Sequence, residues 1–264
     1  MPVTFRCPHC SLPLVEHERV VECDAGHSFD RAREGYVNLL VGGRLAGGQS
    51  GDDDTMVRAR RAVFDAGRYD PIIDAVTAAV RAIDATSVLD AGCGEGTYLA
   101  RACGDVAEGW GIDISKVAVR LAAGRHHACR FAVASIYRLP FADASFDAVI
   151  NVFSPRAFDE MMRVLSPGGI AVVVTPGPAH LAQLKALIYD TPRPHHDDEV
   201  GGPDRERVES VRFTVDLREP ALRRHLLEMT PYWWSANDEA RMRVEAGLGE
   251  VDVDVVLSVY RRAR

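Results

Sequence analysis

A glycine-rich turn constrains what this chain can fold into more than any other segment. In VLDAGCGEG, residues 88–96, an apolar run containing Asp90 is followed by Gly92, Gly94 and Gly96. Glycine lets the backbone turn sharply and approach a ligand without a Cβ atom in the way. At the carboxyl edge of an open α/β sheet, such a turn lies where ligands bind. The turn therefore predicts an α/β fold with a nucleotide-type cofactor.

Segments typical of strands and helices alternate around this turn. Strands are predicted at 87–91, 109–113, 130–134, 146–152 and 170–175. Helices are predicted at 97–103, 116–124, 158–165, 180–189 and 221–229, with a turn at 166–169. Several strands are apolar throughout, as in a parallel sheet covered on both faces, and 251–262 alternates as an antiparallel end strand does. We expect a mostly parallel, seven-stranded, Rossmann-like sheet.

The spacing of the turn distinguishes between two cofactors. The segment GWGID ends in Asp113, whose carboxylate can accept hydrogen bonds from a ribose, and NAD enzymes share this feature. The dinucleotide fingerprint is G-x-G-x-x-G, whereas this turn is G-C-G-E-G. The turn resembles that of class I S-adenosylmethionine-dependent methyltransferases. That resemblance implies that the turn faces the amino-acid part of the cofactor, that Asp113 holds the ribose, and that the backbone of Ser135 and Ile136 contacts the adenine.

A second motif lies near the amino terminus. Cys7, Cys10, Cys23 and His27 form C-x2-C-x12-C-x3-H, and thiolates and imidazoles suit tetrahedral Zn²⁺. All four positions would be filled by protein, so the predicted role is structural. So small a module cannot bury a core of its own, and zinc binding would supply folding free energy of about 10 kcal/mol. His9 and His17 are alternative ligands, and a metal-free cluster is the other interpretation.

These motifs suggest a division of the chain. Residues 1–37 are predicted to be a zinc-ribbon domain with short strands at 3–7 and 19–23, and residues 38–68 a linker and connecting helix. Within the latter, 42–54 is rich in glycine and aspartate, and the helix begins with Thr55 as its N-cap. A second helix is predicted from Pro71 to Ile83, and residues 69–264 are predicted to form the methyltransferase domain.

Composition sets outer limits on function. A net charge of −7 argues against a nucleic-acid binder that acts through a general basic field. Six cysteines in 264 residues are too few and too unevenly placed for a disulfide framework. The sequence contains no apolar run of about 18 residues, so we expect a cytoplasmic protein.

Longer segments identify a family. HSFDRAREGYVNLL, GDDDTMVRARRAVFDAGRYDPI, ASIYRLPF, TPGPAHLAQLKALIY and MTPYWW, together with the two motifs, resemble the bacterial 23S rRNA (guanine-N1)-methyltransferases. That family includes the tylosin-resistance type. The resemblance covers nearly the whole chain. It implies a zinc ribbon that engages an rRNA hairpin, a catalytic domain that methylates a guanine there, and macrolide resistance as an associated property.

The resemblance also assigns residues by motif. It places the zinc ligands on the four residues named above and cofactor contacts on Tyr69, Gly94, Glu95, Gly96 and His180. For Tyr69 the alternative is packing at the domain edge, and for His180 it is capping of a helix.

The catalytic group is left open by the sequence. Guanine N1 bears a proton, which must leave as the methyl group arrives. Asn151, Ser154 and His180 lie at strand ends or just after them and are the candidates to face the base, while positioning alone can supply much of the rate. Asn151 is also predicted to contact the cofactor. Trp233 and Trp234 are candidates either for stacking on an extruded base or for packing inside the domain.

Three further features have two interpretations each. His195 and His196 fit a second metal site or a solvated loop, and Arg58, Arg60 and Arg61 fit phosphate contacts or surface ion pairs. The carboxyl-terminal RRAR segment adds further positive charge, with the same two interpretations. Two other functions also remain, a methyltransferase of a small metabolite and a non-catalytic RNA-binding module. The choice between a monomer and a homodimer, and the guanine within the hairpin, stay undetermined.

Overall fold

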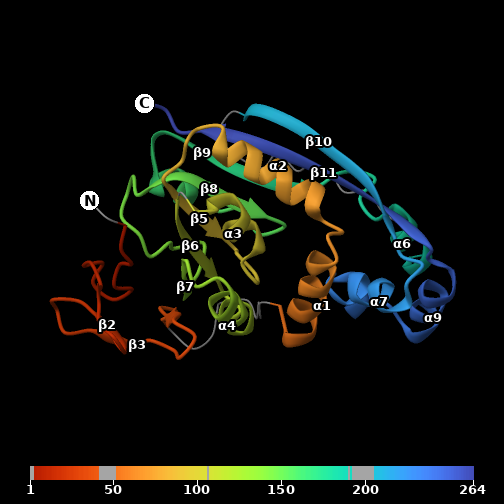
Figure 1. Ribbon diagram of the computed structural model, residues 1–264, viewed down its shortest axis with the longest axis horizontal. Helices are drawn as coiled ribbons and strands as arrows, with labels where there is room; N and C mark the ends of the chain where they lie inside the picture. The colour runs from red at the N-terminus through yellow and green to blue at the C-terminus, as the bar shows by residue number, and fades with distance from the viewer. Residues whose placement is uncertain (1–2, 42–51, 106, 190, 192–204) are drawn as a thin grey trace.

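The computed structural model describes residues 3–41, 52–105, 107–189, 191 and 205–264. A twisted central sheet has helices packed along it, and the amino-terminal residues form a separate small sheet at one end (Figure 1). Helices of the carboxyl-terminal part gather at the opposite end. None of the helices in these residues is both long and apolar enough to cross a membrane.

Eight strands form the central sheet in the described part of the chain, in the order β10-β11-β9-β8-β5-β6-β7-β4. Their bounds are β4 Val37–Asn38, β5 Ser87–Ala91, β6 Glu108–Asp113, β7 Cys129–Val133, β8 Phe146–Val152, β9 Leu165–Pro176, β10 Arg205–Asp216 and β11 Glu250–Arg261. The strands from β4 to β9 pair in parallel, whereas β11 is antiparallel to both β9 and β10. The predicted class I fold is confirmed, with one strand more than the seven expected.

The additional strand comes from the amino-terminal region. β4 pairs in parallel with β7, with Val37 opposite Ala132 and Asn38 opposite Val133. The zinc-binding segment therefore extends directly into the edge of the catalytic sheet, and the boundary predicted after residue 37 falls inside a strand.

Helices connect the parallel strands and cover the sheet. Their bounds are α1 Asp54–Asp65, α2 Asp70–Arg81, α3 Thr97–Cys103, α4 Lys116–Arg125, α5 Phe158–Val164, α6 Ala182–Ile188, α7 Pro220–Glu228, α8 Tyr232–Ser235 and α9 Asp238–Gly247. The N-cap residue of α1 differs from the predicted one. Asp53, not Thr55, caps α1, because the Asp53 carboxylate accepts a hydrogen bond of 2.9 Å from the Met56 N–H.

Two local predictions were wrong. Residues 3–7 form no strand. The small sheet is instead β1 Val15–Glu16, β2 Val20–Glu22 and β3 Ser28–Asp30. The turn expected at 166–169 lies within β9, where the pairing with β8 shifts register and Gly168 has φ +83°. This irregularity allows the chain to change direction without ending the strand.

The core has a layer on each face of the sheet. On one face α2 buries Ile72, Ile73, Val76 and Val80, as the apolar spacing predicted. On the other face Trp110 and Phe146 belong to a cluster that includes Phe5, Leu14 and Val21 of the amino-terminal module. The module thus obtains its apolar core from the catalytic domain.

Candidate functional site

The glycine turn follows β5 at the carboxyl edge of the parallel strands. Gly92, Gly94 and Gly96 have φ values of +94°, +53° and +88°. A side chain at Gly92 would collide with the Ser154 hydroxyl, and one at Gly96 would approach His126 within 2.9 Å. Glycine is required at these positions by both conformation and space.

Asp113 links the turn to the end of β6. Its carboxylate accepts hydrogen bonds from the N–H groups of Gly94, at 2.9 Å, and Ser115, at 2.8 Å. Burial raises the pKa of Asp113, and these two bonds act in the opposite direction. A carboxylate has about four acceptor positions, so Asp113 retains capacity for ribose hydroxyls. The structure therefore brings the two halves of the predicted cofactor site together.

Two more carboxylates are buried beside this turn. Asp90 is 1% exposed and Glu95 is 2% exposed. Glu95 accepts a hydrogen bond of 3.1 Å from the Thr97 N–H, whereas Oε2 of Glu95 and Oδ2 of Asp90 have no hydrogen-bond partner among the described residues. Burial raises the pKa of Asp90, and the charges of Asp113 and Glu95 add to this effect. This donor set fits a cationic ligand, and S-adenosylmethionine carries an ammonium and a sulfonium group.

The end of β8 places Asn151 and Ser154 at the same edge. The Asn151 amide donates to the carbonyls of Ala91, at 2.8 Å, and Pro155, at 3.1 Å. Its Oδ1 atom is buried and accepts no hydrogen bond from the described residues. Ser154 lies against Gly92. Both predicted residues are therefore adjacent to the turn.

His180 is buried in the segment after β9. Its ring lies 5.5 Å from that of Phe153, and its charge acts on Asp254 of β11. The Asp254 carboxylate accepts hydrogen bonds from Ala179, at 3.0 Å, and Arg212, at 2.8 Å. Burial raises the pKa of Asp254, but these bonds hold it below its usual value. Asp254 thus anchors the segment that carries His180, a role that sequence reasoning missed.

Phe153 is the second residue that sequence reasoning missed. It has φ +51°, in the left-handed region, and yet 43% of its surface is exposed. A bulky residue is rarely found in this conformation. Neither the alternation of strands and helices nor the motifs reveal it. The only available signal was its position between Asn151 and Ser154.

Three further residues predicted to contact the cofactor come from segments outside the turn. Tyr69 is buried, with its ring 5.7 Å from Phe64, and burial raises its pKa. Ser135 follows β7 and accepts a hydrogen bond of 3.2 Å from the Tyr137 N–H. Ile136 beside it is partly buried.

The remaining candidates make contacts elsewhere, are exposed, or lie outside the described residues. The Trp233 ring stacks under the Arg241 guanidinium at 4.4 Å, whereas Trp234 is 53% exposed. In the carboxyl-terminal segment, Arg261 pairs with Glu206. His195 and His196 lie outside the described residues.

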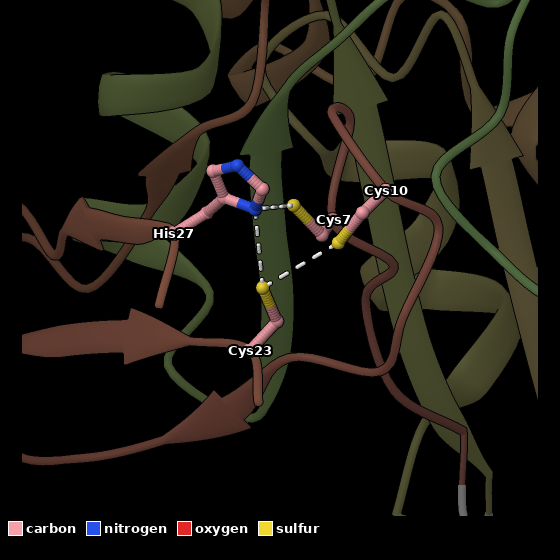
Figure 2. Close-up of side chains that lie close together, drawn as sticks. All are labelled: Cys7, Cys10, Cys23 and His27. Carbon is pink, nitrogen blue, oxygen red and sulfur yellow. Dashed lines mark hydrogen bonds between the residues drawn. The ribbon is translucent and has the colours of Figure 1, made fainter. Parts of the chain in front are cut away.

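The zinc ligands converge in the amino-terminal module (Figure 2). Donor atoms of Cys7, Cys10, Cys23 and His27 all lie within 4.8 Å of one another. His27 Nδ1 is 3.4 Å from the Cys23 sulfur, close to the ligand separations around tetrahedral zinc. Burial raises the pKa of the Cys23 thiol, but hydrogen bonds from the His27 backbone and side chain lower it to about 6. The thiolate needed for metal binding is therefore accessible at neutral pH.

The two alternative histidines are placed outside this group. His17 pairs with Glu22 at 3.1 Å, and the His9 ring lies 4.9 Å from that of His27.

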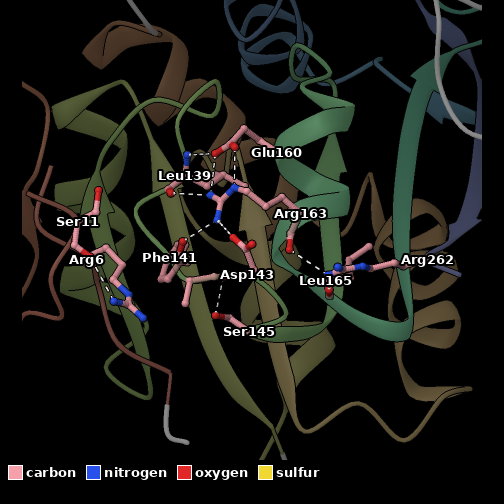
Figure 3. A network of polar contacts seen from close by, with 11 residues as sticks. Arg6, Ser11, Leu139, Phe141, Asp143, Ser145, Glu160, Arg163, Leu165 and Arg262 are labelled. Carbon is pink, nitrogen blue, oxygen red and sulfur yellow. Dashed lines mark hydrogen bonds and ion pairs between the residues drawn. The ribbon is translucent and has the colours of Figure 1, made fainter. Parts of the chain in front are cut away.

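The loop between β7 and β8 contacts the amino-terminal module and is itself held by Arg163 of α5. Arg163 donates to Glu160 at 2.7 and 2.8 Å, to the carbonyls of Leu139 and Phe141, and to Asp143 (Figure 3). The Glu160 carboxylate also accepts the Leu139 N–H at 2.6 Å. Bidentate pairing of this kind fixes geometry in addition to neutralising charge.

The module rests on this loop. The Arg6 N–H donates to the Pro140 carbonyl at 2.8 Å, and the Phe5 ring lies 4.8 Å from Trp110 and 5.4 Å from Phe141. A cavity of about 660 Å³ opens between module and loop, lined by polar groups that include Arg6, Ser11, Ser135 and Arg138. The zinc module and the predicted adenine contact therefore border one cavity.

Comparison with known proteins decides between the possible families. Residues 88–169 match the family model of a methyltransferase domain, and residues 5–41 match that of the RlmA amino-terminal zinc ribbon. A 23S rRNA (guanine(748)-N(1))-methyltransferase of Streptomyces fradiae is 38% identical, with 97% of this chain and 96% of that protein covered. This chain belongs to the 23S rRNA (guanine-N1)-methyltransferase family.

A Bacillus subtilis protein described as a putative 23S rRNA (guanine-N(1)-)-methyltransferase is 32% identical to this chain. The match covers 95% of this chain and 94% of the relative. Among solved structures, a chain in the complex of the Haloferax volcanii Trm112 methyltransferase activator with a methyltransferase has a TM-score of 0.53. It is 21% identical and covers 81% of this chain and 98% of its own length, which shows the shared fold. The methyltransferase domain uses S-adenosylmethionine, and the amino-terminal module is a zinc ribbon.

Proposed function

We propose that this protein transfers the methyl group of S-adenosylmethionine to N1 of a guanine in a hairpin of 23S rRNA. The observation that carries the proposal is the similarity to the S. fradiae enzyme over 97% of the chain, zinc ribbon included. A methyltransferase of small metabolites has no evident use for a ribbon packed beside its cofactor site. Residues 1–37, 38–68 and 69–264 are the proposed functional divisions, although β4 crosses the first boundary.

The reaction sets requirements for the site. A bond forms between guanine N1 and the methyl carbon as the carbon–sulfur bond breaks, and the N1 proton leaves to a base or to solvent. Oδ1 of Asn151 is a buried acceptor beside the turn and suits an N–H group of the guanine. His180 is the titratable candidate for the proton, and Ser154 is a positioning residue against Gly92.

Phe153 supplies a surface for the base. RNA bases drawn out of a helix stack on aromatic side chains. The exposed Phe153 ring lies between Asn151 and Ser154 in sequence and beside His180 in space. We assign the stacking role to Phe153 in preference to Trp233, whose ring is occupied by Arg241.

The zinc ribbon and the loop between β7 and β8 supply the contacts to RNA outside the base. Arg6 and Arg138 line the cavity between ribbon and catalytic domain and suit phosphate groups of the hairpin. Such contacts are local, which is consistent with a net charge of −7. Macrolide resistance would follow if the modified guanine lies at the binding site of the drug. A homodimer would enlarge the protein surface available to RNA.

The direct test is methyl transfer to RNA. The purified protein is incubated with S-adenosylmethionine labelled in the methyl group and either unmodified 23S rRNA or a metabolite extract. We expect label in N1-methylguanosine after nuclease digestion, at one site in a hairpin. Label confined to small metabolites would establish the alternative enzyme, and binding of RNA without transfer would establish the non-catalytic module. Sedimentation of the protein with and without RNA tests the homodimer.

A further inference from the structure

Helix α1 brings one arginine to the cofactor turn. A side-chain carbon at Gly94 would lie 3.3 Å from Nη1 of Arg60, so the guanidinium rests against the turn itself. Arg60 forms an ion pair of 2.5 Å with Asp52, whose carbonyl accepts a hydrogen bond of 2.6 Å from Ser115. Ser115 lies two residues after Asp113, the last residue of β6, so the Asp52–Ser115 hydrogen bond ties the start of α1 to the edge of the sheet.

The positive charge of Arg60 influences the pKa values of several nearby side chains. Burial raises the pKa of Asp113, Tyr69 and Tyr98, and the Arg60 guanidinium acts on each of these pKa values in the opposite direction. Arg60 and Asp52 retain 25% and 30% exposure of their side chains. The guanidinium therefore lies at the border between the site and solvent, where a ligand can meet it.

The neighbouring arginines of α1 face other partners. Arg58 pairs with Asp54 at 2.5 Å, and Arg61 lies 3.7 Å from Asp65. Of the three arginines considered as phosphate contacts, only Arg60 adjoins the turn. Arg58 and Arg61 thus provide matched controls on the same helix.

The acidic residues around the turn leave the α-carboxylate of the cofactor without a favourable partner. Asp90, Glu95 and Asp113 suit the ammonium and sulfonium groups of S-adenosylmethionine, but in their ionised form they repel its α-carboxylate. An amino-acid part that enters this site therefore needs a cation for its carboxylate. A guanidinium has five N–H donors, enough to keep Asp52 and also bind a carboxylate.

We propose that Arg60 binds the α-carboxylate of S-adenosylmethionine and that Asp52 orients the guanidinium for this contact. This inference rests on the use of S-adenosylmethionine and is independent of the RNA substrate. Asp52 acts as a positioning residue, and α1 becomes part of the cofactor site.

The test compares two ligands that differ only in this carboxylate. Binding of S-adenosylmethionine and of decarboxylated S-adenosylmethionine to the full-length, zinc-loaded protein is measured by calorimetry without RNA. For Arg60→Gln we expect the Kd of S-adenosylmethionine to rise roughly 10- to 100-fold, the scale of a lost charge-assisted hydrogen bond, and the Kd of the decarboxylated ligand to stay within about twofold. Arg58→Gln and Arg61→Gln should alter neither Kd.

Arg60→Lys gives a second measurement if the glutamine variant folds poorly. It retains the charge, so part of the preference for the carboxylated ligand should remain. An equal loss of affinity for both ligands, or no loss for either, would overturn the assignment. Because RNA is absent, an error in the proposed rRNA substrate would leave these binding results unchanged.

Discussion

At the residue scale, Phe153 combines two costs that a purely structural side chain would avoid. Its left-handed backbone costs about 1–3 kcal/mol, and the residue is 43% exposed to water. The surroundings hold it there, since the Phe153 N–H donates to the Val174 carbonyl at 3.1 Å. Strain of this kind at the carboxyl edge of a sheet is typical of residues that contact a substrate.

Removal of this ring should affect the RNA and not the cofactor. For Phe153→Leu we expect kcat/KM for rRNA to fall about tenfold or more, because stacking on one base contributes about 1–3 kcal/mol. Phe153→Tyr keeps the ring and should retain most activity. Both variants should bind S-adenosylmethionine like the wild type. Full activity of the leucine variant would exclude the stacking role.

At the element scale, the end of α4 contains a histidine that is sensitive to pH. Burial, followed by the charges of Arg125 and Arg61, lowers the pKa of His126 from 6.5 to about 4. The unfolded chain therefore binds a proton more readily than the folded one between these values. The stabilisation is complete above pH 6.5 and decreases as the pH falls towards 4.

Replacement of His126 should flatten this pH dependence. After allowance for solvent screening of a partly exposed ring, we expect the wild type to lose about 1–2 kcal/mol more than His126→Asn between pH 7 and pH 4.5. Urea unfolding at each pH measures the difference. His127→Asn is the control, since His127 is exposed, and it should follow the wild type. Parallel curves for wild type and His126→Asn would show that the ring does not titrate as described.

Elements encoded by local pattern were predictable, and those that depend on distant partners were not. The segments for β5 and α3 agree with the structure at both ends, because an apolar run and a glycine turn delimit them. β4 has two residues and exists only because β7 is beside it. Arg60 reaches Gly94 across 34 residues of sequence, a proximity that α1 creates and no motif encodes. Asp53 was missed as a cap because Thr55, two residues later, also belongs to the residue types preferred at an N-cap.

At the scale of the whole molecule, zinc and the catalytic sheet are coupled through Phe5. Removal of zinc by a chelator, or Cys23→Ser, should loosen the module and change the surroundings of Trp110, which Phe5 contacts edge-on. In a Trp233→Phe, Trp234→Phe background, Trp110 is the remaining tryptophan. We expect its fluorescence to change together with zinc content and the thermal midpoint to fall by several degrees. An unaltered Trp110 signal in metal-free protein would show that the module is packed independently of its zinc.

The packing of Phe5 also has a consequence for synthesis. Phe5 and the first zinc ligands leave the ribosome well before Trp110 and Phe141, which follow about 105 and 136 residues later, roughly 5–27 seconds at 5–20 residues per second. During that interval the nascent ribbon lacks the apolar partners that the catalytic domain supplies to its core. Metal capture is then the means by which the emerging segment can hold its shape, so scarcity of zinc should reduce the yield of folded enzyme more than the activity of each molecule.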